Sequence, residues 1–334
     1  MTAEHPFAPF IRIIAKGPNL SRPLTRVEMA AAARMILAGA VEPIQLGAFL
    51  CILRLRTEVP EEGAGFVDAL RETFVPPAGA PTVDIDWPSY AGKKRQLPWY
   101  LLSALLLAQN GIRICMQGTE GHTPDRLYSR QALAALGIPA ARSLAEAAEQ
   151  IDRANFAFLP LAILAPRLQE IIELKSLIGV RSPVNTFARH ANPFGAAHQL
   201  LTVVHPNYRA IHRGMAGLLG QPRMAVFKGE GGEAELRPTK PVEVQFMNAG
   251  EAFDESWPAV LPDETAGKIE IMDMSHLRAV WRGQADDVYG RSAIVGTVAI
   301  VLRLMNRAAT PAQALTMAED LWRSRRRDSL PGAV

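Results

Sequence analysis

The sequence predicts an α/β protein, in which a small N-terminal helical bundle precedes a larger α/β domain with a mostly parallel sheet. Three observations carry this prediction. Apolar residues recur at helical spacing through the first 75 residues. Residues 75–81 (VPPAGAP) then form a linker at which the pattern changes. Beyond the linker, short β-type runs alternate with helical runs, which is typical of a sheet of parallel strands.

The N-terminal bundle is expected to contain three helices. The first, residues 24–38, has Thr25 before a run of good helix formers and Glu28 three positions later, which is the pattern of a capping box. The other two begin at Pro43 and Pro60. Proline suits the first turn of a helix because no backbone N–H is needed there.

The elements expected beyond the linker alternate along the chain. Strands are expected at residues 82–85, 111–116, 156–161, 200–204, 224–228 and 242–246. Helices are expected at residues 97–109, 129–136, 144–151, 168–190, 207–218, 290–307 and 311–323. Residues 254–266 are polar and are expected to be irregular. The resulting domains are a helical domain of residues 1–75, joined by returning helices at about 168–195, and an α/β domain of residues 80–165 and 198–330.

The composition is that of a globular protein, with 49% hydrophobic and 21% charged residues. Residues 1–10 lack the apolar core of a secretion signal, and the longest apolar runs, residues 100–108 and 293–302, are too short to cross a bilayer. Cys51 and Cys115 are isolated in apolar contexts, which favours core packing in a reducing compartment over a disulfide or a metal site. A cytoplasmic protein with no membrane partner is therefore expected.

The net charge of +3 conceals an uneven distribution. Residues 230–270 contain ten acidic and three basic residues, a net of −7, so the rest of the chain carries +10. A concentrated basic portion can present a positive surface to a polyanion, although cations also serve simply to solvate a surface. A separate hypothesis is that the acidic segment docks a basic protein partner.

Residues 174–193 (LKSLIGVRSPVNTFARHANP) hold the densest run of unusual chemistry. Arg181 and Arg189 stand among apolar residues, while Pro183 interrupts a helical pattern and Asn185 follows it. Basic and hydrogen-bonding groups on a broken helical element suit an anion, such as a phosphate or a nucleic-acid backbone. The equally open alternative is a helix–turn–helix packing element with solvated arginines.

Three segments in this order resemble anthranilate phosphoribosyltransferase and its relatives. Residues 24–62 are similar to the family's N-terminal helices. Residues 174–193 are similar to the segment that carries a substrate-facing arginine, here Arg181. Residues 226–239 (VFKGEGGEAELRPT) are similar to its glycine-rich, metal-binding turn. The resemblance covers nearly the whole chain and implies a nucleoside phosphorylase/phosphoribosyltransferase-like fold.

Two phosphate-binding loops depart from the family's pattern. The family has a glycine-rich loop after the first sheet strand that cradles a diphosphate with backbone N–H groups, whereas residues 86–94 read DWPSYAGKK here. Aromatic residues and Pro88 fill that space, and the proline removes a donor. In the next loop, Met116 and Glu120 stand where the family has a lysine and an arginine. Both departures oppose diphosphate binding.

The family's metal-binding aspartate–glutamate pair corresponds to Gly232 and Glu233 here. A single carboxylate is a poor magnesium site, so no cofactor is expected, and magnesium is expected only if the chain is a transferase. In that case Glu233 would be a metal ligand, with Glu230 and Glu235 near enough in sequence to compensate for the missing aspartate. The other interpretation of this turn is a solvated acidic loop.

Loss of these features on a retained scaffold resembles the YbiB-type branch of the fold. This resemblance implies a homodimer, formed through the N-terminal helices, that binds DNA and other nucleic acids without marked sequence preference. The cations expected to hold the phosphate backbone are Lys93, Lys94, Arg95, Lys175, Arg181, Arg189, Arg209 and Arg213. The alternative is a divergent glycosyltransferase, a phosphoribosyl- or pentosyltransferase acting on a phosphoribosyl diphosphate-like substrate. Arg181 and Asn185 would then be its catalytic residues.

Aromatic side chains near basic residues are candidates to stack on unpaired bases. These are Trp87, Tyr90, Trp99 and Tyr208. Trp99 and Tyr208 are otherwise expected to be half-buried packing residues. Four of the seven histidines lie in or just after residues 174–193: His190, His198, His205 and His212. They lack the spacing of a zinc site and are expected to add positive charge below about pH 6.5.

Overall fold

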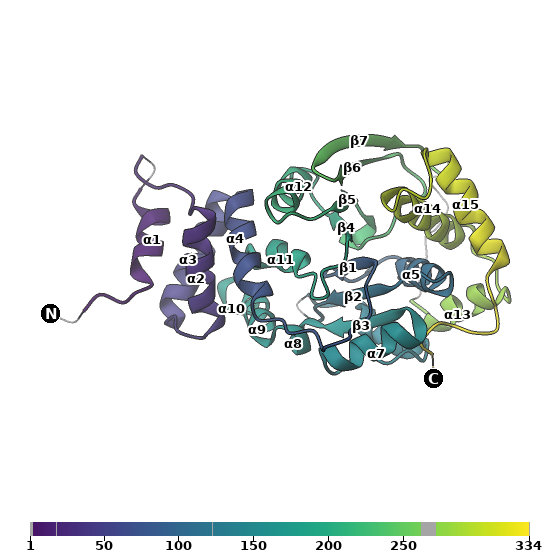
Figure 1. Cartoon of the computed structure of the whole chain (residues 1–334), viewed down its shortest axis with the longest axis horizontal. Helices are drawn as coiled ribbons and strands as arrows, with labels where there is room; N and C mark the ends of the chain where they lie inside the picture. Colours follow the sequence, from purple (N-terminus) through teal and green to yellow (C-terminus); the bar gives the residue numbers. More distant parts are fainter. Residues whose placement is uncertain (1–2, 18, 122, 262–271, 334) are drawn as a thin grey trace.

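The N-terminal bundle forms one end of the molecule in the computed structural model, which describes residues 3–17, 19–121, 123–261 and 272–333 (Figure 1). Its helices are α1 (Ala8–Ala15), α2 (Arg26–Leu37), α3 (Pro43–Arg56) and α4 (Pro60–Arg71). The three predicted helices are present, and α1 is an addition to them. The capping box is confirmed, because Thr25 Oγ1 accepts the Glu28 N–H and the Glu28 carboxylate accepts the Thr25 N–H.

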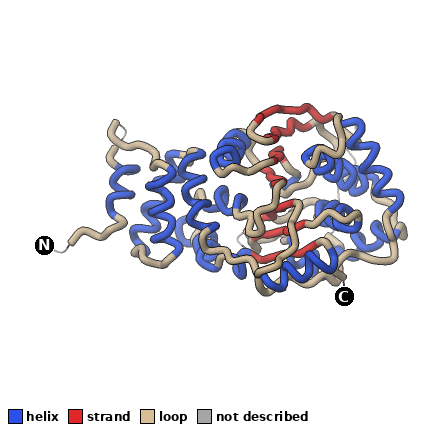
Figure 2. Tube along the Cα trace, in the orientation of Figure 1, coloured by secondary structure: helices blue, strands red, loops and turns tan. Residues whose placement is uncertain are grey.

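The strands of the described chain form one seven-stranded sheet in the order β3-β2-β1-β4-β5-β6-β7. Figure 2 shows strands in red with helices in blue on both sides of them. The parallel strands are β1 (Ile85–Ser89), β2 (Ile114–Gly118), β3 (Phe156–Pro160), β4 (His198–Val203) and β5 (Arg223–Lys228). The antiparallel ones are β6 (Val242–Asn248) and β7 (Glu251–Trp257). The prediction of an α/β protein with a mostly parallel sheet is therefore confirmed.

Two strands differ from the prediction. The first strand is β1, not residues 82–85, and it contains Pro88. Proline is tolerated there because β4 pairs with β1 only at Ile85 and Asp86, so the proline's missing N–H has no strand partner on that side. Strand β7 occupies part of residues 254–266, which were expected to be irregular. The prediction is wrong there because β7 is an edge strand, and the charged side chains that edge strands carry hide the alternating pattern of a strand. Residues 262–266 of that segment lie outside the described residues.

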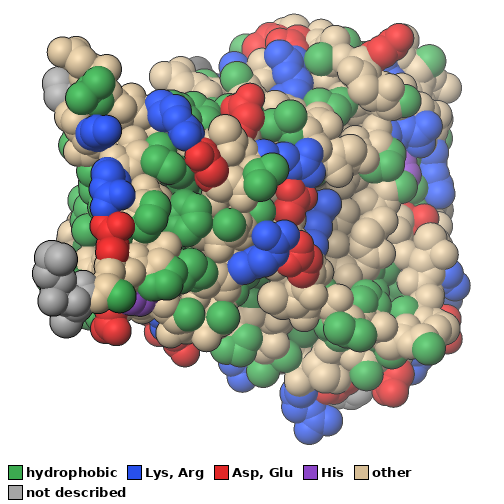
Figure 3. Space-filling view, turned by 60° about the vertical axis from the view of Figure 1, so that its left-hand side comes forward, with side chains coloured by type: hydrophobic (Ala, Val, Ile, Leu, Met, Phe, Trp, Pro, Cys, Tyr) green, Lys and Arg blue, Asp and Glu red, His purple; other side chains and the backbone are tan. Residues whose placement is uncertain are grey.

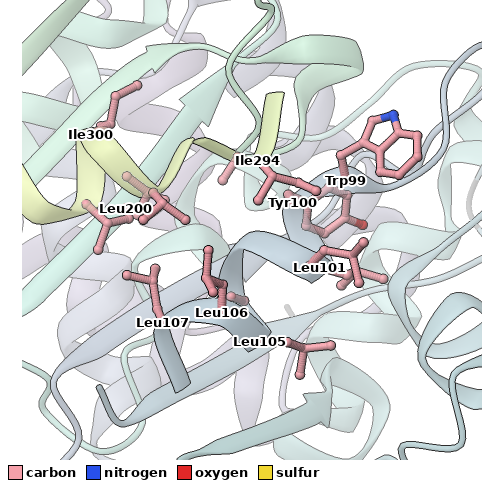
Figure 4. Close-up of a cluster of buried hydrophobic side chains, with 14 of the residues drawn as sticks. Trp99, Tyr100, Leu101, Leu105, Leu106, Leu107, Leu200, Ile294 and Ile300 are labelled. Atoms are coloured by element: carbon pink, nitrogen blue, oxygen red, sulfur yellow. The ribbon is translucent and has the colours of Figure 1, made fainter. Parts of the chain in front are cut away.

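The larger core covers one face of the sheet. Its centre is α5 (Trp99–Gln109), which is buried from Trp99 to Ala108 because it is apolar on all sides. Figure 4 shows its side chains in one cluster with Leu200 of β4 and with Ile294 and Ile300 of α14 (Val288–Leu304). The other helices of this core are α6 (Ser129–Ala135), α13 (Met274–Arg282), α14 (Val288–Leu304) and α15 (Pro311–Ser324).

A second core joins the bundle to the opposite face of the sheet. It includes residues of α7 (Leu144–Ala154), α8 (Leu161–Leu164), α9 (Pro166–Glu173), α11 (Val184–Phe187), the 3-10 turn η1 (Ala188–His190) and α12 (Tyr208–Leu218). The helix predicted at residues 168–190 is interrupted after α10 (Lys175–Ile178), because Gly179 adopts φ +76° and Pro183 follows. Phe66 of α4 meets Phe187 with ring centres 5.2 Å apart. Within the described ranges, no helix combines the length and apolarity needed to cross a membrane.

Candidate functional site

A cavity of about 210 Å³ lies where several parallel strands end. Its wall includes Tyr90 and Ala91 after β1, Val204 after β4 and Gly231 after β5. Helices α3, α11 and α12, the turn η1 and the loops before α6 and α11 contribute the other sides. Because the chain leaves β1 toward β2 and later returns to β4 on the other side of β1, this is the switch point of the sheet. Open α/β sheets generally bind ligands at such a point.

Arginines from separate parts of the chain meet in this cavity, which we call the arginine cavity. They are Arg54, Arg126, Arg181 and Arg189. Within the part of the chain that the structure describes, no Asp or Glu is among the lining residues. Arg54 Nη1 donates to Tyr208 Oη at 2.7 Å, and Arg181 Nη2 donates to Thr123 Oγ1 at 3.4 Å. The cavity is therefore a concentration of positive charge.

Two buried side chains in the cavity wall have donors without a partner among the described residues. Arg189 is 9% exposed, stacks 5.5 Å from the centre of the Tyr90 ring, and leaves Nη1 unpaired. Ser182 is 6% exposed and leaves Oγ unpaired. Burial lowers the pKa of Arg181 and of Arg189, and the like charge of Arg126 lowers the pKa of Arg181 further. Unpaired buried donors beside guanidinium groups suit a ligand with several anionic oxygens.

Two carboxylates of the chain hold the loop after β1, residues 90–93. Glu233 Oε1 accepts the N–H groups of Ala91 at 2.7 Å and Gly92 at 2.6 Å. Lys93 Nζ donates to Glu235 Oε1 at 2.6 Å, and both side chains are buried. Burial raises the pKa of both glutamates, against the opposing effects of Arg189 on Glu233 and of Lys93 on Glu235.

These contacts do not fit a magnesium site. Glu233, the ligand expected in a transferase, directs one oxygen at two backbone donors, and Glu235 is committed to Lys93. The prediction that Glu235 compensates for the missing aspartate is therefore wrong. Across the described ranges, no group of three or more His, Cys, Asp or Glu side chains is arranged to hold a metal ion.

The cations predicted to hold a nucleic acid do not form one surface. Lys93 is 1% exposed and ion-paired, so its predicted contact with a phosphate backbone is wrong. Arg189 is buried in the cavity wall. Lys94 and Arg95 are exposed, with Lys94 Nζ 3.9 Å from a carboxylate oxygen of Asp125.

The remaining predicted cations divide into two groups. Arg209 and Arg213 lie on α12 and turn toward the antiparallel strands. Arg209 Nη1 donates to a main-chain carbonyl of β6 at 2.8 Å, and Arg213 Nη1 pairs with an aspartate of β7 at 2.5 Å. Lys175 Nζ instead donates to Thr123 Oγ1 at 3.4 Å, as Arg181 does. The structure thus brings Lys175, Arg181 and Arg189 together and separates the two cations of α12 from them.

The histidines do not behave as one cationic group. His190 Nε2 and His212 Nδ1 lie 2.8 Å apart, and their stacked rings are buried. Burial lowers the pKa of His190 to about 3 and lowers that of His212 well below its usual value. Burial also lowers the pKa of His198. The prediction of positive charge below pH 6.5 is wrong for the buried pair His190 and His212. For His198 the onset of positive charge moves to a lower pH, whereas His205 is exposed at the cavity.

The predicted stacking aromatics are mostly core residues. Trp87, Tyr90 and Trp99 are buried, so their predicted contact with bases is wrong. Tyr90 donates its hydroxyl hydrogen to Gln117 Oε1 and forms part of the cavity wall. Tyr208 is half-buried beside the cavity and accepts a hydrogen bond from α3, as a packing residue does.

Sequence reasoning missed Arg54 and Arg126. Arg54 belongs to the last turn of α3, where arginine commonly has only a local role. Arg126 is a single cation in the loop after β2, and its Nη1 donates to the carbonyls of Ala91, Gly92 and Gly231 at 2.9, 3.0 and 3.2 Å. No local pattern marks either residue, because their proximity arises only when the bundle meets the sheet.

The acidic segment, residues 230–270, is partly internal. Glu233 and Glu235 are buried, and Asp254 and Glu255 of β7 pair with Arg213 and Arg303. Residues 262–270 lie outside the described residues. Docking of a basic protein on this segment stays a prediction. The segment offers such a partner fewer exposed carboxylates than the count of acidic residues in the sequence implies.

Comparisons with known proteins place this site on a known scaffold. Residues 8–74 match the helical bundle domain of a glycosyl transferase family. The chain is 32% identical over 231 residues to anthranilate phosphoribosyltransferase of Anaeromyxobacter sp. (strain Fw109-5), covering 68% of this chain and 67% of that protein. This chain belongs to the anthranilate phosphoribosyltransferase family.

Two further proteins are similar to this chain. The chain is 30% identical over 203 residues to the uncharacterized protein YbiB of Escherichia coli (strain K12), covering 59% of this chain and 63% of YbiB, which is less than two thirds of that protein. The crystal structure of anthranilate phosphoribosyltransferase from Thermus thermophilus shares the fold, with a TM-score of 0.75, 23% identity and 94% coverage of both chains. Family membership explains the scaffold.

Proposed function

We propose that this chain is a divergent member of the transferase family that binds a phosphorylated small molecule of the phosphoribosyl class in the arginine cavity. The observation that carries the proposal is the convergence of four arginines on one cavity whose described lining contains no carboxylate. The unpaired donors of Arg189 and Ser182 support it, because buried donors are normally satisfied and a phosphate offers several acceptors. Solved and curated relatives named as phosphoribosyltransferases favour the same ligand class.

If the bound ligand is turned over, we assign the reaction to a pentosyl transfer that does not depend on magnesium. In a pentose 1-phosphate donor, the bond between C1 and the phosphate oxygen would break and the phosphate would leave with the electron pair, while the acceptor nucleophile bonds to C1 and releases its proton to solvent. Arg181 would stabilise the negative charge of the leaving phosphate, since fixed cations in a partly buried site are effective there. Asn185 is half-buried in the cavity wall, and its Nδ2 donates to Ser182 O at 3.2 Å, which fixes the amide for contact with a substrate hydroxyl.

Replacing Arg181 by alanine is expected to weaken binding of ribose 5-phosphate by about 10- to 100-fold, as loss of a hydrogen bond to a charged group predicts. Isothermal titration calorimetry measures this effect with and without magnesium, and magnesium is expected to make no difference. Arg209→Ala is the matched control, because Arg209 lies on α12 outside the cavity lining. Equal affinities for the Arg181 and Arg209 variants, or no binding by the unmodified protein, would contradict the proposal.

Nucleic-acid binding is the second candidate function. It is favoured by the position of exposed Lys94 and Arg95, since the backbone of Lys93 pairs with Leu127 in the loop that carries Arg126. These cations lie beside the arginine cavity and could extend its positive charge onto the surface. A nucleic acid bound there would release counterions and show a strong salt dependence.

A Lys94→Ala/Arg95→Ala double variant is expected to reduce the salt slope of single-stranded DNA binding by about one to two units, one for each lost phosphate contact. Fluorescence polarisation at several salt concentrations measures the slope. Arg34→Ala serves as the control, because Arg34 is an exposed arginine of the bundle that pairs with Glu72. An unchanged slope, or binding that does not respond to salt, removes this candidate.

We also propose that the chain forms a homodimer through its N-terminal helices. Ile44, Ala48, Cys51 and Leu55 form an exposed stripe along α3, with Ile44 82% and Leu55 87% exposed. Figure 3, turned to bring the bundle forward, shows hydrophobic side chains gathered on that part of the surface. Such a stripe is typical of a face that a partner covers.

Leu55→Glu is expected to convert the dimer to a monomer, because a carboxylate would replace the most exposed large apolar side chain of the stripe and be buried in the contact. Size-exclusion chromatography with light scattering measures the mass of the particle. Val75→Glu, at an 80% exposed linker position, is expected to remain a dimer. A monomeric unmodified protein, or a dimeric Leu55 variant, would show that α3 is not the interface.

A further inference from the structure

The backbone of residues 91 and 92 forms a small anion site that the chain fills by itself. Two consecutive N–H groups, of Ala91 and Gly92, converge on a single oxygen of Glu233 at 2.7 and 2.6 Å. Converging backbone donors of this kind bind phosphates and carboxylates in many proteins. Glu233 is fully buried, and its second oxygen has no hydrogen-bond partner among the described residues. Its carboxylate therefore occupies a place that an anionic ligand could take.

Two glycines allow the turn that carries Glu233 to place this carboxylate against residues 91 and 92. Gly229 has no room for a side chain, because an added Cβ would lie 1.9 Å from Glu233 O. Gly232 adopts φ +93°, and an added Cβ would lie 2.7 Å from Val204 Cγ2 and 3.0 Å from Ala91 Cβ. Closure of the turn on itself thus depends on glycine at position 229, and its close approach to residue 91 depends on glycine at position 232.

Arg126 ties the filled anion site to the arginine cavity. Its Nη1 donates to the carbonyls of Ala91 and Gly92 on one loop and of Gly231 on the other. Arg126, Ala91 and Gly231 all line the cavity, so a ligand held by the arginines lies next to the two backbone donors. A ligand with a second phosphate could reach those donors only by displacing the Glu233 carboxylate.

We infer that Glu233 sets the ligand specificity of this site: it stands in for a second phosphate, so that the arginine cavity takes phosphate monoesters and gains no affinity from the second phosphate of a diphosphate. This inference rests on the proposed function for the identity of the monoester ligand. Displacing Glu233 would separate a carboxylate from two charge-assisted hydrogen bonds and bring it near an incoming anion. Both effects oppose diphosphate binding.

Comparing inorganic phosphate and inorganic pyrophosphate as probes tests this inference. The unmodified protein is expected to bind the two with similar affinity. Glu233→Gln keeps the size of the side chain and removes its charge, so it is expected to raise the affinity for pyrophosphate relative to phosphate about tenfold. Glu230→Gln is the matched control, because Glu230 lies in the same turn and carries the same charge but does not touch the two donors.

Hydrogen–deuterium exchange of residues 90–93 gives a second readout. In the Glu233 variant, pyrophosphate is expected to slow exchange at Ala91 and Gly92, and in the unmodified protein it is expected to leave exchange unchanged. An unchanged pyrophosphate-to-phosphate ratio in the folded Glu233→Gln protein overturns the inference. If that variant does not fold, the unmodified protein decides: a preference for pyrophosphate with slowed exchange at residues 90–93 overturns the inference, and equal affinities with unchanged exchange support it.

The experiments distinguish failure of the proposed function from failure of the specificity role of Glu233. If ribose 5-phosphate does not bind but Glu233→Gln gains pyrophosphate binding, the role of Glu233 stands and the proposed ligand class is wrong. If ribose 5-phosphate binds through Arg181 but Glu233→Gln shows no gain, the proposed function stands and the specificity role is wrong.

Discussion

Lys93→Met is expected to lower the free energy of unfolding by about 3–5 kcal/mol, which is the usual cost of removing one partner from a buried ion pair. Lys93 and Glu235 are 1% and 0% exposed, and their charged atoms are 2.6 Å apart. Methionine matches the length of the lysine stem but leaves Glu235 buried without its counter-charge. Urea unfolding followed by circular dichroism at pH 8 measures the change.

Two comparisons isolate the cause of this loss. Lys94→Met changes the adjacent lysine, whose side chain is 58% exposed, and is expected to change stability by less than about 1 kcal/mol. Lys93→Met/Glu235→Gln removes both charges and is expected to recover much of the stability, because the introduced amide oxygen can still accept the Tyr100 N–H that Glu235 accepts at 2.9 Å. A loss for Lys93→Met no larger than that for Lys94→Met would show that the buried pair is not important for folding.

The burial of Lys93 could not be predicted from the sequence. In the sequence it stands in a row with Lys94 and Arg95, and nothing local separates one lysine from the next. Its partner lies 142 residues away, on the turn after β5. Burial depends on which distant segment covers a residue, so a row of cations predicts a charged surface even where the fold turns one of them inward.

Local signals predicted elements well where one segment determines its own structure. The capping box of Thr25 and Glu28 and the proline starts at Pro43 and Pro60 all mark observed helix starts. The apolar run of α5 predicted a helix, and the structure buries it. Strand β7 was missed because an edge strand has only one protected face and tolerates charges that hide its period.

The candidate site was only partly predictable for a related reason. Arg181, Arg189 and Asn185 share one segment and were found together. Arg54 and Arg126 reach the same cavity from the bundle and from the loop after β2, and only the tertiary fold joins them. The site divides its chemistry: the arginines present positive charge to the cavity, while Glu233 and Glu235 neutralise the loop beside it. This division favours a small anion in the cavity over a long basic track.

The pH dependence of stability is expected to reveal a second buried carboxylate, Asp86 of β1. It is fully buried, accepts a hydrogen bond from Gln199 Nε2 at 2.9 Å, and leaves Oδ1 without a partner among the described residues. Burial raises its pKa to about 7 from 3.8, against smaller lowering effects of Gln199 and Arg71. A carboxyl whose folded pKa is raised contributes stability that is fully present below pH 3.8 and is lost as the pH rises through 7.

Asp86→Asn is therefore expected to gain stability relative to the unmodified protein by about 2–3 kcal/mol between pH 5 and pH 8. Urea unfolding at intervals across this range measures the difference, and effects of other titrating groups cancel because both proteins carry them. His212→Gln should show the opposite trend: burial lowers the His212 pKa, so its contribution is present above pH 6.5 and is lost as the pH falls. A constant difference between Asp86→Asn and the unmodified protein across the range would mean that Asp86 is ionised in the folded state at pH 5, which would require a compensating cation closer than Arg71.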